Sequence, residues 1–199
     1  MEHIAQKIPI PSWGIPACGG LAIGLIAIFF PQTLGVGYGV TEAALLMEFS
    51  LTLLIVIGIA KILATAISIG FGFSGGVFSP SLVIGAMVGG SFGIIATAIL
   101  PEYSSGPVAY TIVGMGAVAA SVLGAPISTT LIIFEMTKNY ALTLAVMLAV
   151  VISTEISHHF FGRSFFSVQL KNRGINVKEG FESEVMRSKK ISEVFFFIR

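Results

Sequence analysis

The stretch 70–85 contains residue types that could bind an anion within an otherwise apolar part of the chain. Glycines, serines and a proline stand there in place of the leucines that an ordinary membrane span would carry. Glycine permits irregular backbone, so the sequence predicts a loop to about Gly76. Pro80 fits the first turn of a helix, which then starts near Val77 or Phe78. The first N–H groups of that helix have no acceptor inside it and lie at the positive end of its dipole, where they could bind an anion.

An irregular loop at membrane depth is tolerated only where it is buried in protein or lines a cavity, so a broken helix there indicates a binding site. The alternative is that the glycines merely allow close helix packing. Gly70, Gly72 and Gly75 also match the dinucleotide fingerprint, which needs an acidic residue about 20 positions later. No acidic residue lies between Phe49 and Pro101, so we do not expect a nucleotide site.

The composition indicates an integral membrane protein. Of the 199 residues, 55% are hydrophobic and 11% are charged, and the mean hydropathy is +0.95. Soluble domains carry about a quarter charged residues. Segments 8–41, 62–101 and 103–134 contain no Asp, Glu, Lys or Arg, and each exceeds the roughly 20 apolar residues that span a bilayer. Their glycines and prolines predict short, tilted or broken helices.

Turn residues divide these segments into helices. The expected helices are 13–30, 42–57 and 51–69 with a bend near Ser50, 77–100 as one helix or two, 108–123, 127–137, 141–160 and 164–173. The helix 127–137 is too short to cross a bilayer alone. Gly20 and Gly24 could let a neighbouring helix approach closely. A repeated spacing of four separates Gly85, Gly89 and Gly93.

Three motifs, in this order, resemble those of the CLC family of chloride channels and proton-coupled chloride exchangers. Residues 31–39 resemble the P-x-x-L-G-x-G-Y-G stretch of that family. Gly76-Val77-Phe78-Ser79-Pro80 resembles its G-x-F-x-P signature. Residues 114–137 are similar to its segment that runs from G-M-G-A through A-P-I-S to F-E-M-T. These matches extend over most of the chain.

The resemblance implies an all-α polytopic transmembrane bundle with broken and re-entrant helices, as in the second half of the CLC inverted-repeat fold. It also implies that the backbone N–H groups of Val77 and Phe78 contact a chloride ion in the pore. The anion-binding residues that it implies are Gly76, Val77, Phe78, Ser79, Pro80 and Phe166. The family has a tyrosine at the last of these positions, and phenylalanine cannot donate the hydrogen bond of its hydroxyl. Either the inner gate is apolar here, or the alignment is shifted by one residue.

The first half of the family's membrane unit has no counterpart in this sequence, which lacks the G-S-G-I-P loop and the G-(K/R)-E-G-P loop with the gating glutamate. We therefore expect chloride transport as part of a channel or an H⁺/Cl⁻ exchanger, with a separate N-terminal half as a partner. The resemblance also implies a homodimer with segment 126–160 at the interface. Two alternatives stay open: a non-transporting membrane fragment with a structural or assembly role, and an unrelated ion-coupled secondary transporter.

Charged residues within the apolar segments are candidates for function. Lys61 is the single charge between Phe49 and Pro101. It could serve transport, or it could reach an interface or pair with a glutamate such as Glu48. Glu135 and Glu155 could relay protons, or they could cap helices or form pairs near the cytoplasmic face.

No pattern indicates a catalytic or metal site. His158 and His159 are adjacent, so they do not face each other on a helix, and no cluster of Cys or carboxylates joins them. The sequence lacks the G-x-S-x-G nucleophile motif. With Cys18 as its single cysteine, the chain cannot form an internal disulfide. We expect no enzyme activity, no cofactor and no nucleic-acid partner.

Two regions are expected: a transmembrane region, 1–173, and a charged segment, 174–199. The second region resembles a cytoplasmic linker with the truncated start of a CBS domain. Eight of the eleven Lys and Arg residues follow Phe161, so the positive-inside rule predicts a cytoplasmic C-terminus, in the cell (inner) membrane.

Overall fold

The computed structural model describes residues 14–73, 75–162 and 164–172, and all regular secondary structure within them is helical. In chain order the elements are α2 (Gly14–Phe29), the 3-10 helix η1 (Pro31–Thr33), α3 (Tyr38–Leu45), α4 (Leu51–Gly70), α5 (Phe78–Ile99), α6 (Pro107–Leu123), α7 (Pro126–Thr137), α8 (Tyr140–Phe161) and α9 (Phe165–Asn172). The predicted all-α fold is confirmed. The predicted cytoplasmic segment, 174–199, lies outside the described residues.

Turn and capping residues set the helix boundaries. The bend expected near Ser50 is the break before α4, where its Oγ accepts a hydrogen bond from the N–H of Leu53 at 3.4 Å. Gly124 adopts the left-handed conformation with φ 69° and ends α6, and Pro126 begins α7. Left-handed glycine and N-terminal proline are typical of these two positions. α5 is one helix of 22 residues rather than two.

Within the described residues, three helices are long and apolar enough to cross a bilayer. They are α4, α5 and α8, the last within the apolar stretch Tyr140–Leu170. α2 and α6 are also apolar but shorter. α7 has 12 residues, about 18 Å of helix, which is too short to cross, as the sequence predicts.

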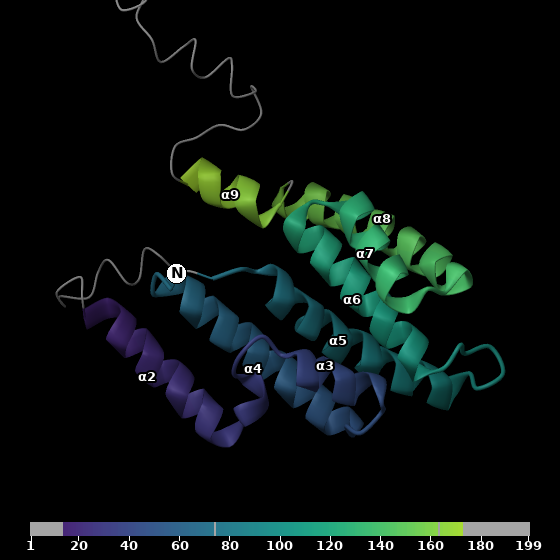
Figure 1. The fold of residues 1–199 in the computed structure, drawn as a ribbon, viewed down its shortest axis with the longest axis horizontal. Coiled ribbons are helices and arrows are strands. Elements are labelled where there is room, and N and C mark those ends of the chain that lie inside the picture. Colours follow the sequence, from purple (N-terminus) through teal and green to yellow (C-terminus); the bar gives the residue numbers. More distant parts are fainter. Residues whose placement is uncertain (1–13, 74, 163, 173–199) are drawn as a thin grey trace, which may run out of the picture.

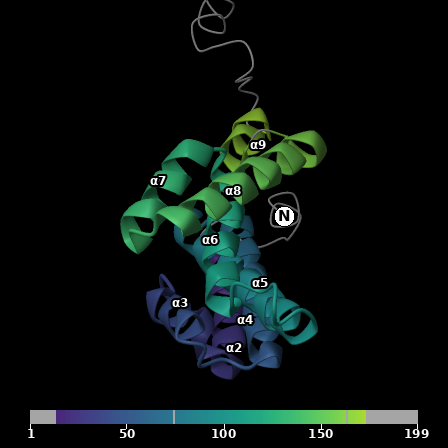
Figure 2. The ribbon, with the colours of Figure 1, turned by 90° about the vertical axis from the view of Figure 1, so that its right-hand side faces the viewer.

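The helices lie in three tiers (Figure 2). One tier holds α2, α3 and α4, the middle tier holds α5 and α6, and the third holds α7, α8 and α9 (Figure 1). α5 packs on both α4 and α6, and α6 also packs on α7 and α8. Fully buried side chains from different tiers form the core, among them Ile57, Met87, Ile133 and Val146. α5 is therefore held between α3 and α4 on one side and α6 on the other.

Glycines let α5 and α6 lie backbone to backbone. A Cβ atom at Gly93 would lie 2.7 Å from the Cα of Pro107, and one at Gly85 would overlap the carbonyl oxygen of Gly114. Gly89 is equally close to α6. Small residues at such a spacing allow helix backbones to approach in a membrane. The three glycines spaced four residues apart thus form the surface of α5 that contacts α6.

The close packing expected at Gly20 and Gly24 is found one position earlier. No atom lies within 4 Å of a Cβ built at Gly24, and at Gly20 the nearest atom is Cζ of Phe73 at 3.9 Å. A Cβ at Gly19 would lie 2.7 Å from the Cβ of Phe71. The prediction for Gly24 is wrong because the side of α2 that faces a neighbour is set by tertiary structure.

We expect Gly89→Ala to destabilise the fold, because the added methyl group would overlap the carbonyl oxygen of Tyr110 on α6. Overpacking of this kind costs about 1–3 kcal/mol. Gly24→Ala is the matched control, since it adds the same group to a helix where there is open space. Thermal unfolding of both variants in detergent, followed by circular dichroism, measures the difference. Equal melting temperatures would contradict the backbone contact.

Candidate anion-binding site at the start of α5

An irregular segment separates α4 from α5, as the sequence predicts. α4 ends at Gly70, and Gly72 follows with a positive φ of 81°. Val77 is the N-cap of α5, and the helix begins at Phe78. Val77 is buried, whereas Gly75 and Gly76 just before it are exposed. The break therefore lies between two apolar helices, at the position where an anion site is expected.

The first amides of α5 are available as donors. Within the described residues, no hydrogen bond has the N–H of Val77, Phe78 or Ser79 as its donor. Pro80 has no N–H, and the first amide bonded to this turn is that of Ser81, whose N–H donates to the Val77 carbonyl at 3.2 Å. Unbonded amides at a helix N-terminus carry a partial positive charge. The arrangement can therefore bind an anion through backbone groups.

Ser79 ties this first turn to residues 31–37, which we call the bracing segment. Its Oγ donates a hydrogen bond to the carbonyl of Val36 at 2.6 Å. Ser81 acts locally instead, since its Oγ donates to the carbonyl of Phe78 at 2.6 Å. The hydroxyl of Ser79 is thus used to hold the turn in place.

Lys61 binds the bracing segment from the other side. The residue is 4% exposed, and its Nζ donates to the carbonyl of Thr33 at 2.8 Å and to that of Gly35 at 3.0 Å. The partner of the ammonium group is therefore not Glu48, which was one of the alternatives. Backbone carbonyls bind it instead, because residues 31–37 are mostly non-helical and come close to the middle of α4.

A cavity of about 460 Å³ lies beside the start of α5. Phe78 and Ser79 line it together with Glu42 of α3, Met115 of α6 and Met136 of α7. Glu42 is exposed, so the cavity wall carries a carboxylate that the sequence analysis did not single out. Its position as the fifth residue of α3 became informative only once that helix was placed against α5.

Phe166 does not line this cavity. It lies in α9, which packs on α6, and its ring contacts that of Phe165 with the centroids 5.7 Å apart. The side chain is 46% exposed. The structure thus brings Val77, Phe78 and Ser79 together in one turn, whereas Phe166 lies on a separate helix.

The other charged candidates lie apart from this turn. Glu135 is exposed near the end of α7, and Glu155 is exposed in α8. His158 and His159 occupy the last turn of α8. Among the described residues, no group of three or more His, Cys, Asp or Glu side chains could hold a metal ion.

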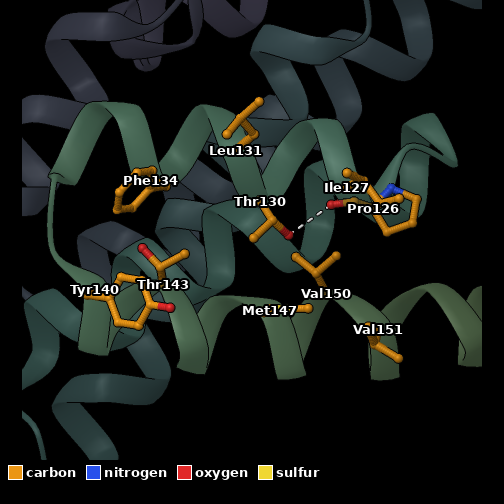
Figure 3. Close-up of a pocket in the computed structure, with 10 residues that line it drawn as sticks. All are labelled: Pro126, Ile127, Thr130, Leu131, Phe134, Tyr140, Thr143, Met147, Val150 and Val151. Atoms are coloured by element: carbon orange, nitrogen blue, oxygen red, sulfur yellow. Dashed lines mark hydrogen bonds between the residues drawn. The ribbon is translucent and has the colours of Figure 1, made fainter.

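A second hollow, of about 390 Å³, lies between α7 and α8 (Figure 3). Its walls are mainly apolar, with Leu131 and Phe134 on α7 and Met147 and Val151 on α8. The hydroxyl of Thr130 is satisfied within α7, since Oγ1 donates to the carbonyl of Pro126 at 2.8 Å. This hollow falls within the segment that the sequence analysis assigns to a dimer interface.

Comparisons with known proteins agree with the motifs. The family model described as voltage gated chloride channel matches residues 1–158. A ClcB-like protein of Ralstonia nicotianae, named as a chloride channel protein, is 39% identical over 142 residues, which cover 71% of this chain and 33% of that protein. Chloride channel protein CLC-f of Arabidopsis thaliana is 38% identical over 160 residues, 75% of this chain and 20% of that protein.

The H(+)/Cl(-) exchange transporter ClcA of Citrobacter koseri is 32% identical over 154 residues, which cover 77% of this chain and 32% of that protein. The chain thus spans a third or less of the length of the curated relatives it matches.

We expect Gly37→Ala to loosen the bracing segment and the first turn of α3. Gly37 has a φ of 90°, and a Cβ there would also overlap the side chain of Val83. Its carbonyl accepts the N–H of Thr41 at 3.0 Å. Strain at a left-handed residue costs of order 1–3 kcal/mol before any clash is added. Hydrogen–deuterium exchange in α3 should therefore become faster.

Gly35→Ala is the matched control for this variant. Gly35 also has a positive φ, of 67°, but no atom lies within 4 Å of a Cβ built there. If Gly35→Ala accelerated exchange in α3 as much as Gly37→Ala, the contact with Val83 would not matter.

Proposed function

Because the chain belongs to the family of voltage-gated chloride channels, we propose that it transports chloride across a membrane as the second half of a CLC-type membrane domain. The chain is an integral membrane protein with apolar helical spans. It belongs to a family of ion channels and transporters and is not an enzyme, as expected. The names of its relatives include both a chloride channel and an H(+)/Cl(-) exchange transporter, and the proposal covers either mode.

One observation carries the proposal: α5 begins after a break between two apolar helices, and its first amides have no acceptor among the described residues. Unsatisfied backbone donors in apolar surroundings are costly, so a site of this kind favours a ligand that accepts hydrogen bonds. The helix dipole favours a negative ligand. We assign chloride binding to the turn formed by Gly76, Val77, Phe78, Ser79 and Pro80.

The proposed inner end of the pathway differs from that of the family. The resemblance aligns Phe166 with a tyrosine of the family, and a phenylalanine ring cannot donate a hydrogen bond to an anion. In this proposal the inner gate is apolar, and the backbone amides of Val77 and Phe78 supply the donors in this half of the pathway. Binding should then depend little on which side chains occupy the turn.

The proposed assembly is a homodimer with a separate first half. α7 and α8 supply the interface between copies, and the apolar hollow between them supports this role. The proposed orientation has the C-terminus in the cytoplasm and the chain in the inner membrane, and the excess of basic residues after Phe161 supports it. The re-entrant arrangement of broken helices that the family fold implies belongs to the same proposal.

Halide efflux from liposomes tests the proposal. The chain is co-expressed with a first half of a CLC membrane domain, the complex is purified, and chloride efflux is compared with that of each half alone. We expect efflux from the complex only. Absence of efflux with any first half would instead support a structural or assembly role. Thermal protection by sodium or a carboxylate substrate, but not by chloride, would support an unrelated transporter.

We expect Val77→Pro to weaken chloride binding by roughly tenfold or more, because proline lacks the amide donor while the φ of −90° at Val77 lies near its allowed range. A hydrogen bond to a charged group contributes about 1.5–3 kcal/mol. Val77→Ala is the matched control, since it shortens the side chain but keeps the N–H. Calorimetric titration of the complex with chloride measures both. Equal affinities would show that this amide does not bind the anion.

A further inference from the structure

Lys61 places a positive charge in the middle of α4, an otherwise apolar helix. Burial of an ammonium group is costly unless hydrogen-bond acceptors surround it. Carbonyls in the middle of an α-helix are engaged in their own helix, whereas Thr33, the last residue of η1, and Gly35 offer theirs to Nζ at 2.8 and 3.0 Å. Lys61 and the bracing segment therefore fix each other's position.

The bracing segment also contacts the start of α5. The carbonyl of Val36 accepts the hydroxyl of Ser79 at 2.6 Å. Gly37 lies against Val83 one turn further along, and a Cβ built at Gly37 would be 3.7 Å from Nζ of Lys61. The segment thus touches the ammonium group on α4 and the first two turns of α5 at the same time.

We propose that Lys61 is a positioning residue for the anion site: through the bracing segment and the hydroxyl of Ser79, it orients the first turn of α5 so that the amides of Val77 and Phe78 converge on one point. The inference rests on the proposed function, because it assigns a role in chloride binding at that site. In this proposal Lys61 acts through the bracing segment and not as an anion ligand: Nζ gives two of its three N–H donors to the carbonyl oxygens of Thr33 and Gly35.

A double-mutant cycle tests this linkage. Lys61→Met and Ser79→Ala each remove one end of the chain of contacts, and both are compared with the double variant in the reconstituted complex. Each single change should raise the chloride concentration for half-maximal efflux by about tenfold, which corresponds to about 1.4 kcal/mol. The maximal rate of efflux should change by a smaller factor than this concentration. For the double variant, the chloride concentration for half-maximal efflux should be no higher than for the more impaired single variant.

Two results would overturn the inference. One is a chloride dependence of Lys61→Met equal to that of the unchanged protein. The other is a double variant in which the increase in the chloride concentration for half-maximal efflux equals the product of the two single increases. Lys61 and Ser79 would then act independently, and Lys61 would act only through its charge. Thr65→Val is the matched control on α4: its Oγ1 bonds within the helix to the carbonyl of Lys61, at 2.8 Å, and it should leave chloride dependence unchanged.

A measurement without substitution covers the case in which Lys61→Met fails to fold. Hydrogen–deuterium exchange of the unchanged complex is followed with sodium chloride and with sodium gluconate. Chloride should slow exchange both in the first turn of α5 and in residues 31–37. Slower exchange in α5 alone would overturn the linkage while leaving the proposed function intact. Unchanged exchange in both segments would overturn the proposed function and this inference with it.

Discussion

Backbone groups without partners are costly in apolar surroundings, and this constraint governs the break between α4 and α5. The break is held by contacts that reach it from elsewhere in the chain. Lys61 satisfies two carbonyls of the bracing segment, and Val36 accepts the hydroxyl of Ser79. The amides of Val77 and Phe78 are left as donors among the described residues. The carbonyls that have hydrogen-bond partners and the amides that have none in the described part of the chain together define the site.

Small residues and apolar packing supply the frame around these polar contacts. α5 carries the site at its first turn and the glycines that face α6 further along. α6 in turn packs on α7 and α8, which contain the apolar hollow. α5 and α6 together therefore join the proposed anion site to the helices of the proposed interface.

The sequence predicts the helices well where local chemistry decides their limits. Ser50 as a cap, Gly124 in the left-handed region and Pro126 at a first turn each act within a few residues of the chain. The stretch around Val77 in the same way predicts where α5 starts, and it predicts the family to which the chain belongs.

Contacts between segments that are distant in the sequence could not be predicted from local sequence patterns. Lys61 and Thr33 lie 28 residues apart, and Ser79 and Val36 lie 43 apart. Periodicity therefore gave no reason to prefer a carbonyl over Glu48 as the partner of Lys61.

The glycine contact between α5 and α6 has a mechanical consequence. Side chains between most helices can change rotamer and absorb a small displacement, but none stand between Gly85 and Gly114. A displacement at the start of α5 would therefore be transmitted almost fully to α6, and the two helices should move together as one rigid body.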